Sequence, residues 1–158
     1  MIRPMLSGDA DAVAGLIRLA FSAIPVRLEP PPSALLETGE AVRAHLQAGG
    51  GALVEGPLAC VLWAEREGGL YVSRLCTHPS HWGRGLAVTL VQQAEAEARR
   101  RNLPRLHLGV RLALLDNRRL FAQLGFEETR LHTHAGCAAP TWTEAERWLA
   151  PTDFEPGR

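Results

Sequence analysis

The first part of the chain shows a helical spacing of apolar side chains. Between positions 13 and 24, apolar residues recur three and four positions apart, with polar residues between them. This spacing predicts an amphipathic helix over residues 9–22, and Ser7 or Asp9 can cap its N-terminus. The short segment 2–4 before the helix predicts an edge strand, where a proline is tolerated.

A second helix and a run of strands follow a proline-rich loop. Ser33 opens the predicted helix, and the glycines at 49–51 end it. Its expected inner face carries four apolar residues: Leu35, Leu36, Val42 and Leu46. Apolar segments at 52–55, 58–65 and 70–77 then predict three strands joined by short turns. Connections this short join antiparallel neighbours, so these strands form a meander.

The meander leads into a helix and a further strand. Residues 86–101 carry a buried apolar stripe and two outward glutamate–arginine pairs at i,i+4 spacing. Residues 105–110 alternate apolar and other side chains as a strand does. A strand, a crossover helix and a second strand make a βαβ unit, so the strand at 70–77 and the strand at 105–110 should run parallel.

Helix and strand signals continue towards the C-terminus. A helix is predicted over Asn117–Leu124, a strand from Phe126, and Trp148 is placed on a terminal helix. No repeat or linker divides the chain, so residues 1–158 are expected to form one domain. The expected fold class is α/β: a mixed, mostly antiparallel sheet with helices on both faces.

Composition excludes several classes of site. The 17 basic residues balance the 17 acidic ones, and all of the basic residues are arginine. Without lysine, a Schiff-base mechanism and a P-loop phosphate site are excluded. A nucleic-acid binder usually has a basic surplus, so no nucleic-acid partner is expected.

Cysteine usage and hydropathy bear on the compartment. Cys60, Cys76 and Cys137 have no Cys-x-x-Cys spacing, which predicts free thiols and no metal site. Acidic residues precede the first apolar stretch, the reverse of a signal peptide, and no segment reaches the ~20 apolar residues of a membrane span. We therefore expect a soluble, cytoplasmic protein with no membrane partner.

The turn before the 86–101 helix is the strongest candidate for chemistry. Gly83 and Gly85 let the backbone approach a ligand closely, and the free N–H groups of the helix N-terminus attract an anion. A dinucleotide-binding fingerprint needs a third glycine where Val88 stands, and a Walker loop needs lysine. The turn alone therefore predicts an anion at a helix N-terminus.

The strings around this turn resemble the GNAT family of N-acetyltransferases. Leu75-Cys76-Thr77-His78-Pro79 is similar to the family's central strand, which reads Leu-x-Val-x-Pro. His81-Trp82-Gly83-Arg84-Gly85-Leu86-Ala87 resembles its turn, and Asn117, Phe121 and Leu124-Gly125-Phe126 resemble its late helix. The resemblance extends over nearly the whole chain.

The resemblance implies acetyl-CoA as co-substrate. The diphosphate would lie on the N–H groups of the turn, and the pantetheine would lie along the central strand. Eleven residues would then contact the cofactor: Leu75, Cys76, Thr77, Trp82, Gly83, Arg84, Gly85, Leu86, Ala87, Asn117 and Phe121. An N–H of Cys76 or Thr77 would polarise the thioester carbonyl.

Four positions are candidate catalytic residues by resemblance or adjacency: Tyr71, Cys76, His78 and Asn117. Tyr71 stands where some GNAT members carry a glutamate, and Phe121 replaces the tyrosine that often protonates the departing thiolate. Trp82 replaces the usual glutamine or arginine. The candidates for the general base are His45, His78, His132, Glu55 and Glu128.

Three other patterns have simpler explanations. Cys76 and His78 share one face of a strand, but a buried cysteine is usually an apolar filler. His132 and His134 lack a third metal ligand nearby. The triplet Arg99–Arg101 complements the helix dipole, although in this fold it could also meet the 3′-phosphate of CoA.

The expected function is therefore N-acetylation of a small amine, an amino acid derivative or a peptide N-terminus, by direct attack in a ternary complex. Two alternatives remain: a catalytically degenerate acyl-CoA-binding module, and transfer of a different acyl group. The acceptor walls are expected from the loop Pro25–Ser33 and from His134–Thr141. A homodimer is compatible with such a fold.

Overall fold

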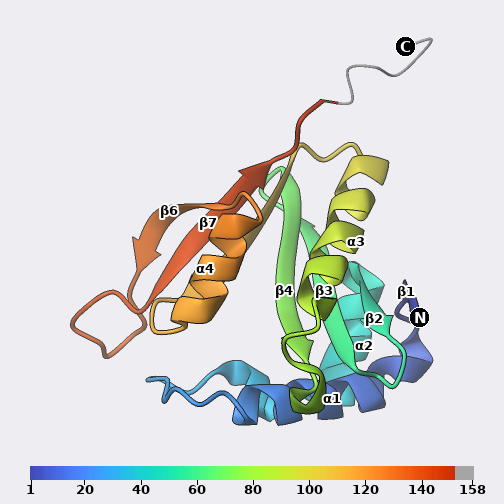
Figure 1. The fold of residues 1–158 in the computed structure, drawn as a ribbon, viewed down its shortest axis with the longest axis horizontal. Helices are drawn as coiled ribbons and strands as arrows, with labels where there is room; N and C mark the ends of the chain where they lie inside the picture. Colours follow the sequence, from blue (N-terminus) through green and yellow to red (C-terminus); the bar gives the residue numbers. More distant parts are fainter. Residues whose placement is uncertain (152–158) are drawn as a thin grey trace.

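The computed structural model describes residues 1–151, and within them seven strands form one sheet in the order β1-β2-β3-β4-β5-β7-β6 (Figure 1). The strands are β1 (Ile2–Pro4), β2 (Gly50–Val54), β3 (Ala59–Arg66), β4 (Gly69–Thr77), β5 (Arg105–Arg111), β6 (Glu127–His132) and β7 (Trp142–Trp148). Strands β4 and β5 pair parallel, and the other five neighbouring pairs are antiparallel. This confirms the predicted mixed, mostly antiparallel sheet.

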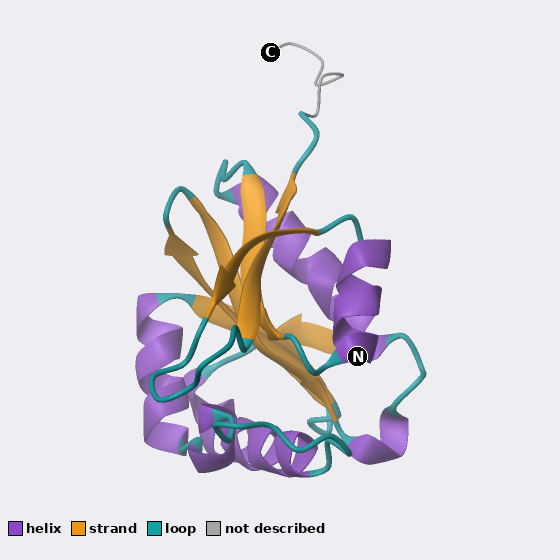
Figure 2. Cartoon of the chain, turned by 90° about the vertical axis from the view of Figure 1, so that its left-hand side faces the viewer, coloured by secondary structure: helices purple, strands orange, loops and turns teal. Residues whose placement is uncertain are grey.

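Helices cover both faces of the sheet (Figure 2). The α-helices in the described range are α1 (Ala10–Ser22), α2 (Gly39–Ala48), α3 (Leu86–Arg100) and α4 (Leu115–Gln123). Short 3-10 turns, η1 (Ser7–Asp9), η2 (Ser33–Leu36) and η3 (Pro79–His81), precede α1, α2 and α3. None of the helices within residues 1–151 is long and apolar enough to cross a membrane.

The alternation of side chains along β3 shows how the sheet separates two cores. Val61 and Trp63 pack in one apolar cluster with residues of α3 and α4. Cys60 and Leu62 point the other way, into a cluster formed with α1 and α2. Successive side chains of a strand point to opposite faces, so an uninterrupted apolar run such as this indicates a strand buried on both sides.

Helix α3 has the predicted buried stripe, and both predicted ion pairs form, but they are not turned to solvent as expected. Leu90, Val91, Ala94 and Ala98 are buried against the sheet. Glu95 accepts a hydrogen bond from Arg99 at 3.2 Å, and Glu97 accepts one from Arg101 at 2.6 Å. These pairs lie at the border of the helix and the sheet, where Arg147 also pairs with Glu95 and Glu65 with Arg101. The crossover that α3 provides makes β4 and β5 parallel neighbours, as expected.

The second predicted helix is divided in the structure. Residues Ser33–Leu36 form η2, and α2 begins only at Gly39. Thr38 lies between them in an extended conformation, and its hydroxyl oxygen accepts a hydrogen bond from the N–H of Ala41 at 3.1 Å. This N-cap starts a new helix. The expectation that Leu36 faces inward was wrong, since its side chain is 82% exposed.

The prediction of a terminal helix at Trp148 was also wrong. Residues 142–148 form β7, which pairs with β5 on one side and β6 on the other. Thr143 and Ala145 are buried, whereas their neighbours Trp142, Glu144 and Glu146 are only partly buried. A period of two is typical of a strand, and it is clear only once both neighbouring strands are in place.

Candidate functional site

A bulge in β4 separates this strand from β5. Cys60 of β3 pairs with Cys76, whereas Leu62 pairs with Ser73, so β4 carries one residue more than β3 over this stretch. Arg74 in the bulge has a φ of 53°. The register between β4 and β5 includes only Leu70 and Tyr71 of β4. A bulge bends its strand away from the regular ladder, so the carboxyl half of β4 leaves the side of β5.

The remaining ladder shows which backbone groups of β4 are directed to this gap. The N–H of His78 donates to the carbonyl oxygen of Leu58 at 2.7 Å. The backbone N–H and C=O groups of successive residues alternate in direction along an antiparallel strand. Those of Cys76 therefore also point to β3, and those of Thr77 point the other way. Of the two N–H groups considered for the thioester carbonyl, only that of Thr77 is therefore directed away from β3.

The gap opens into a cleft of about 890 Å³. Its walls come from the end of β4, the turn before α3, the first turn of α3, the start of α4 and the end of α1. All of the residues predicted to contact the cofactor line it: Leu75, Cys76, Thr77, Trp82, Gly83, Arg84, Gly85, Leu86, Ala87, Asn117 and Phe121. The structure thus brings together residues that are more than 40 positions apart in sequence.

The glycine turn presents its backbone to this cleft. Gly83 and Gly85 have φ values of 78° and 76°, and no atom lies within 4 Å of a β-carbon built on either. Gly85 is the N-cap of α3, and the first hydrogen bond within the helix runs from the N–H of Thr89 to the carbonyl oxygen of Gly85, at 3.2 Å. The N–H groups of the first helical residues have no acceptor within a helix. They form a binding site for an anion.

Trp82 ties this turn to the central strand. Its indole Nε1–H donates to the carbonyl oxygen of Thr77 at 2.8 Å, while 46% of the residue stays exposed. The sequence comparison suggested only that a polar side chain is lost at this position. In the structure the tryptophan instead holds the start of the turn against the end of β4.

Asn117 and Phe121 line the opposite wall, on α4. Asn117 is exposed at the start of the helix. Phe121 is only 8% exposed, and its ring packs edge-on against Phe126, with 5.6 Å between the ring centroids. A phenyl ring has no proton to donate, so this wall lacks the acid that a tyrosine would supply.

Tyr71 lies outside the cleft. Its ring packs edge-on against His107 with centroids 5.2 Å apart, and the Arg66 guanidinium lies 4.1 Å from its centroid. Burial lowers the pKa of His107 below its usual value. Tyr71 lies six positions before Thr77, about 20 Å along a strand. The resemblance placed Tyr71 on the central strand but did not specify its distance from the cleft.

Cys76 and His78, which share one face of the strand in the sequence prediction, each contact other residues in the structure. The Cys76 sulfur lies 3.7 Å from that of Cys60. This contact and burial raise the pKa of the Cys60 thiol well above its usual value. The Nδ1 of His78 accepts a hydrogen bond from the N–H of Ser80 at 3.1 Å. Cys76 lines the cleft and His78 does not.

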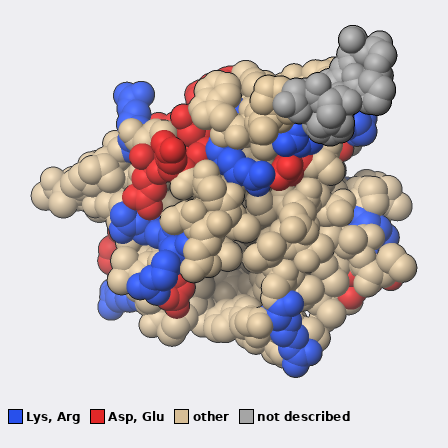
Figure 3. Space-filling view, turned by 45° about the horizontal axis from the view of Figure 1, so that its top comes forward, with Lys and Arg blue, Asp and Glu red and all other residues tan. Residues whose placement is uncertain are grey.

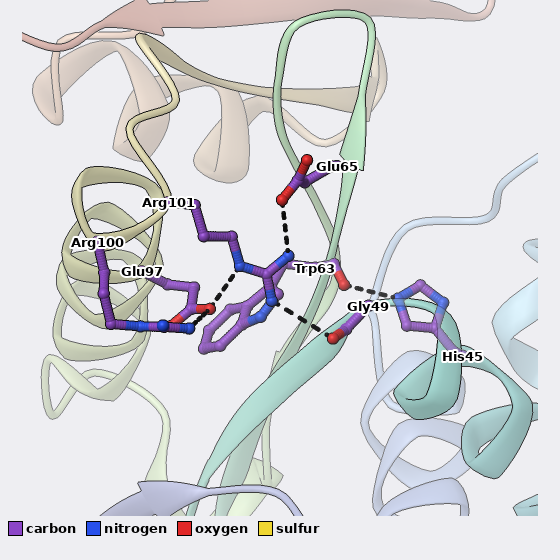
Figure 4. A network of polar contacts seen from close by, with 7 residues as sticks. All are labelled: His45, Gly49, Trp63, Glu65, Glu97, Arg100 and Arg101. Atoms are coloured by element: carbon purple, nitrogen blue, oxygen red, sulfur yellow. Dashed lines mark hydrogen bonds and ion pairs between the residues drawn. The ribbon is translucent and has the colours of Figure 1, made fainter.

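Five side chains are candidates for the general base, and none of them lines the cleft: His45, His78, His132, Glu55 and Glu128. Glu55 and Glu128 accept hydrogen bonds from Arg3 and Arg118 at 2.9 and 2.8 Å, and the bond from Arg118 lowers the pKa of Glu128. His45 contacts the carbonyl oxygen of Trp63 at 3.2 Å (Figure 4). The side chains of Glu55, Glu128 and His45 thus form internal contacts away from the cleft.

Two titratable residues of the cleft were missed in the sequence. His81 lines the cleft just before the glycine turn, with its Nδ1 2.8 Å from the hydroxyl of Ser80. Asp116 lines it beside Asn117 and accepts a hydrogen bond from Arg119 at 3.1 Å. The available signal in the sequence was that each lies directly beside a residue of the motifs, His81 beside Trp82 and Asp116 beside Asn117. In residues 1–151 no group of three or more His, Cys, Asp or Glu side chains could hold a metal ion.

The arginine triplet at the end of α3 is occupied by internal contacts. Arg101 donates to Glu97 at 2.6 Å, to Glu65 at 3.4 Å and to the carbonyl oxygen of Gly49 at 3.4 Å (Figure 4). A helix of this length separates the triplet from the glycine turn by roughly 20 Å. Arg101 therefore joins α3 to the sheet, whereas Arg100, which is exposed, pairs with Glu97 of its own helix.

Both stretches expected to form acceptor walls border cavities. Pro25 and Val26, which follow α1, line the cleft. A smaller cavity of about 200 Å³ lies next to it, lined by residues 27–29, by residues 111–113 at the end of β5, and by Pro140 and Thr141. Ala113 lines both spaces. Arg111 also lines this smaller cavity, which was not predicted from the sequence.

Comparison with known proteins supports the resemblance. The model of the acetyltransferase (GNAT) family matches residues 29–126. No curated protein matches the chain.

Solved structures of this family share the fold. The ribosomal-protein-S18-alanine N-acetyltransferase of Escherichia coli is 15% identical, with a TM-score of 0.73, and the match covers 98% of this chain and 97% of that one. A GNAT family acetyltransferase of Elizabethkingia anophelis, solved with acetyl-CoA bound, is 14% identical, with a TM-score of 0.67 and coverage of 94% and 97%. PaiA N-acetyltransferase of Thermoplasma acidophilum, in complex with coenzyme A, is 13% identical, with a TM-score of 0.71 and coverage of 94% and 98%.

The family model covers more than half of the chain, and the fold agrees over nearly all of it. The chain therefore belongs to the GNAT family of acetyltransferases.

Proposed function

We propose that this protein transfers the acetyl group of acetyl-CoA to the nitrogen of a small amine, an amino acid derivative or a peptide N-terminus. The observation that supports this is a single cleft in which the glycine turn, the free edge of β4 and the start of α4 meet. The relatives solved with acetyl-CoA or CoA bound support the choice of co-substrate. The Escherichia coli relative is named for an alanine of a ribosomal protein, which supports a peptide acceptor.

Each part of the cleft has a separate role in this proposal. The N–H groups from Gly83 to Ala87 bind the diphosphate, with Arg84 adding positive charge. The free edge of β4 holds the pantetheine between the two splayed strands. The N–H of Thr77 points to the gap and donates to the thioester oxygen, where negative charge develops as the amine attacks.

The acetyl thioester supplies the reactive carbonyl carbon. The walls of the cleft hold the acceptor amine next to this carbon, so that a bimolecular reaction becomes effectively unimolecular. The amine nitrogen forms a bond to this carbon, the carbon–sulfur bond breaks, the nitrogen loses a proton, and the thiolate gains one. Since Phe121 cannot provide that proton, water at the open cleft does so.

Phe121→Tyr is expected to raise kcat. A hydroxyl on this wall would donate a proton to the departing thiolate, and general acid catalysis contributes about 10²-fold or more when the acid is well placed. Because Phe121 is nearly buried, we expect a smaller gain, roughly 3- to 30-fold. Steady-state kinetics with a fixed amine measure it, and Phe126→Tyr, on the neighbouring ring, is the matched control. An unchanged kcat at unchanged stability would show that thiolate protonation does not limit the rate.

The main alternative is an acyl-CoA-binding module without catalytic activity. Two observations favour it: Phe121 replaces the acid, and the five candidate bases lie outside the cleft. A third possibility is transfer of a longer acyl group. Calorimetric titration with acetyl-CoA and longer acyl-CoAs tests the binding step.

Release of free thiol with a panel of amines and peptides tests the transfer step. We expect micromolar binding of acetyl-CoA and thiol release with at least one amine class. Tight binding with no release on any amine would favour the module, and faster release from a longer acyl-CoA would favour the third possibility.

The proposal also includes one domain over residues 1–158, a cytoplasmic location and no nucleic-acid partner. Basic and acidic side chains are interspersed on the face seen in Figure 3, which supports the last point. A homodimer remains a prediction, which sedimentation would test.

A further inference from the structure

Arg111 is placed on the acceptor side of the cleft. It is the last residue of β5, in which Leu106, Leu108 and Val110 pack in the core with α3 and α4. Because side chains alternate along a strand, Arg111 faces the opposite side of the sheet. There it lines the small cavity together with the loop at 27–29 and with Thr141.

Within residues 1–151, no carboxylate lies within 4.0 Å of the positively charged guanidinium of Arg111. Every other partly buried arginine in this part of the chain lies within 4.0 Å of a carboxylate. Burial lowers the pKa of its guanidinium. Glu29 lines the same cavity, but it is bonded to Arg27 at 2.9 Å, and its side chain is 60% exposed. A partly desolvated charge is costly unless a counter-charge compensates it.

Apart from Glu29, the residues that line the small cavity with Arg111 carry no negative charge. The Thr141 hydroxyl contacts Nδ1 of His134 and also accepts a hydrogen bond from the His134 N–H at 3.0 Å. Burial and the charge of Arg111 lower the pKa of His134, which disfavours its charged form. Cys137 is the remaining titratable neighbour of this arginine. The cavity is suited to an anion.

The cavity borders the proposed acetyl-transfer site. Ala113 lines both the cavity and the cleft. Strands β4 and β5 are parallel, with Leu70 opposite Leu106, so their carboxyl ends lie at the same edge of the sheet. By this register Arg111 lies level with Leu75 and Cys76, across the gap in which the thioester would sit. An acceptor could therefore reach both Arg111 and the cleft.

We infer that the acceptor is an amine that also carries a carboxylate, and that Arg111 binds this carboxylate. The planar fork of a guanidinium donates two parallel hydrogen bonds to the two oxygens of a carboxylate. Such a pair fixes the position of the amine and compensates the charge of Arg111. This inference rests on the proposed function, and it makes Arg111 a specificity-determining residue. The carboxylate belongs either to a free amino acid or to an acidic residue of a peptide.

The test uses matched pairs of acceptors. Amino acids and ω-amino acids of increasing length are each compared with the amine that lacks the carboxylate. Peptides with an acidic second residue are compared with their amide counterparts, which distinguishes the two sources of the carboxylate. Thiol release gives kcat/KM for each, and calorimetry with the CoA-loaded protein gives binding without turnover.

The variants are Arg111→Gln, which removes the charge, and Arg111→Lys, which keeps the charge and loses the fork. Arg130→Gln is the matched control, since Arg130 is exposed on β6 and lines neither cavity. For carboxylate-bearing acceptors, Arg111→Gln should lower kcat/KM and affinity roughly 10- to 100-fold, and Arg111→Lys should give a smaller loss. Acceptors without a carboxylate and the Kd of acetyl-CoA should change less than about twofold, since neither contacts Arg111.

Each outcome decides separately on the two proposals. Turnover of amines with no preference for a carboxylate, or an equal loss for both members of each pair in Arg111→Gln, would overturn the role of Arg111 and leave the transferase intact. Arg111-dependent binding of carboxylates without any turnover would support the role of Arg111 and overturn the proposed transfer. No binding of any carboxylate to the CoA-loaded wild type would overturn the inference directly. Thermal melting of both Arg111 variants verifies that they fold.

Discussion

Gly85→Val is expected to weaken acetyl-CoA binding by about 100-fold. Gly85 has a φ of 76°, a region that β-branched residues rarely adopt. A valine there costs roughly 1–3 kcal/mol of backbone strain or forces the turn to move. Its side chain would also stand where the diphosphate approaches the N–H groups of α3. Isothermal titration of acetyl-CoA into wild type and variant measures the change.

A second glycine separates backbone strain from the loss of the site. Gly68, in the turn between β3 and β4, has a φ of 74° and likewise no atom within 4 Å of a built β-carbon. It does not line the cleft. Gly68→Val should lower the melting temperature about as much as Gly85→Val and leave the Kd of acetyl-CoA unchanged. Equal loss of affinity in both variants, or normal binding by Gly85→Val, would show that the diphosphate lies elsewhere.

Glu37→Ala is expected to lower the free energy of unfolding by about 2–3 kcal/mol. The Glu37 carboxylate accepts a hydrogen bond from Nε of Arg74 at 2.7 Å, and its side chain is only 8% exposed. Removing it leaves the guanidinium of Arg74, which is 28% exposed, without its counter-charge. We place the loss below the full value for a buried pair because water screens Arg74 in part.

This ion pair also bears on the site. It joins the segment after η2 to the bulge of β4, at which β4 leaves β5. Urea denaturation measures the loss of stability. Glu55→Ala is the control, because Glu55 is 52% exposed in its pair with Arg3, and an exposed pair contributes less than about 1 kcal/mol. If the two variants lose equal stability, the Glu37–Arg74 pair has no special role in holding the bulge.

The elements that could be predicted are those specified by nearby residues. The helix at residues 9–22, the meander and the crossover helix agree with the structure within a few residues. In each, the period of apolar side chains and the residues at the ends act over one or two turns of chain. The division at Thr38 was missed because its cap competes with an apolar pattern that continues across it.

The candidate site was predictable to a similar extent. The positive φ of Gly83 and Gly85 and the N-terminus of α3 follow from a few consecutive residues. The wall that contains Asn117 and Phe121 came only from the family resemblance, since it lies on another helix. The candidates for the base came from residue type alone, which carries no information on distance to the cleft.

The sequence by itself determined the glycine turn, the helix that follows it and the strand that precedes it. Only the tertiary structure decided what surrounds them. The bulge at Arg74 turns β4 away from β5, the indole of Trp82 reaches back to Thr77, and Arg111 faces a cavity closed by residues 27–29 and by Thr141. The physical reason is that local conformation depends on neighbours in the chain. Strand register, bulges and cavities depend instead on pairings between distant segments, which form only when the whole sheet is assembled.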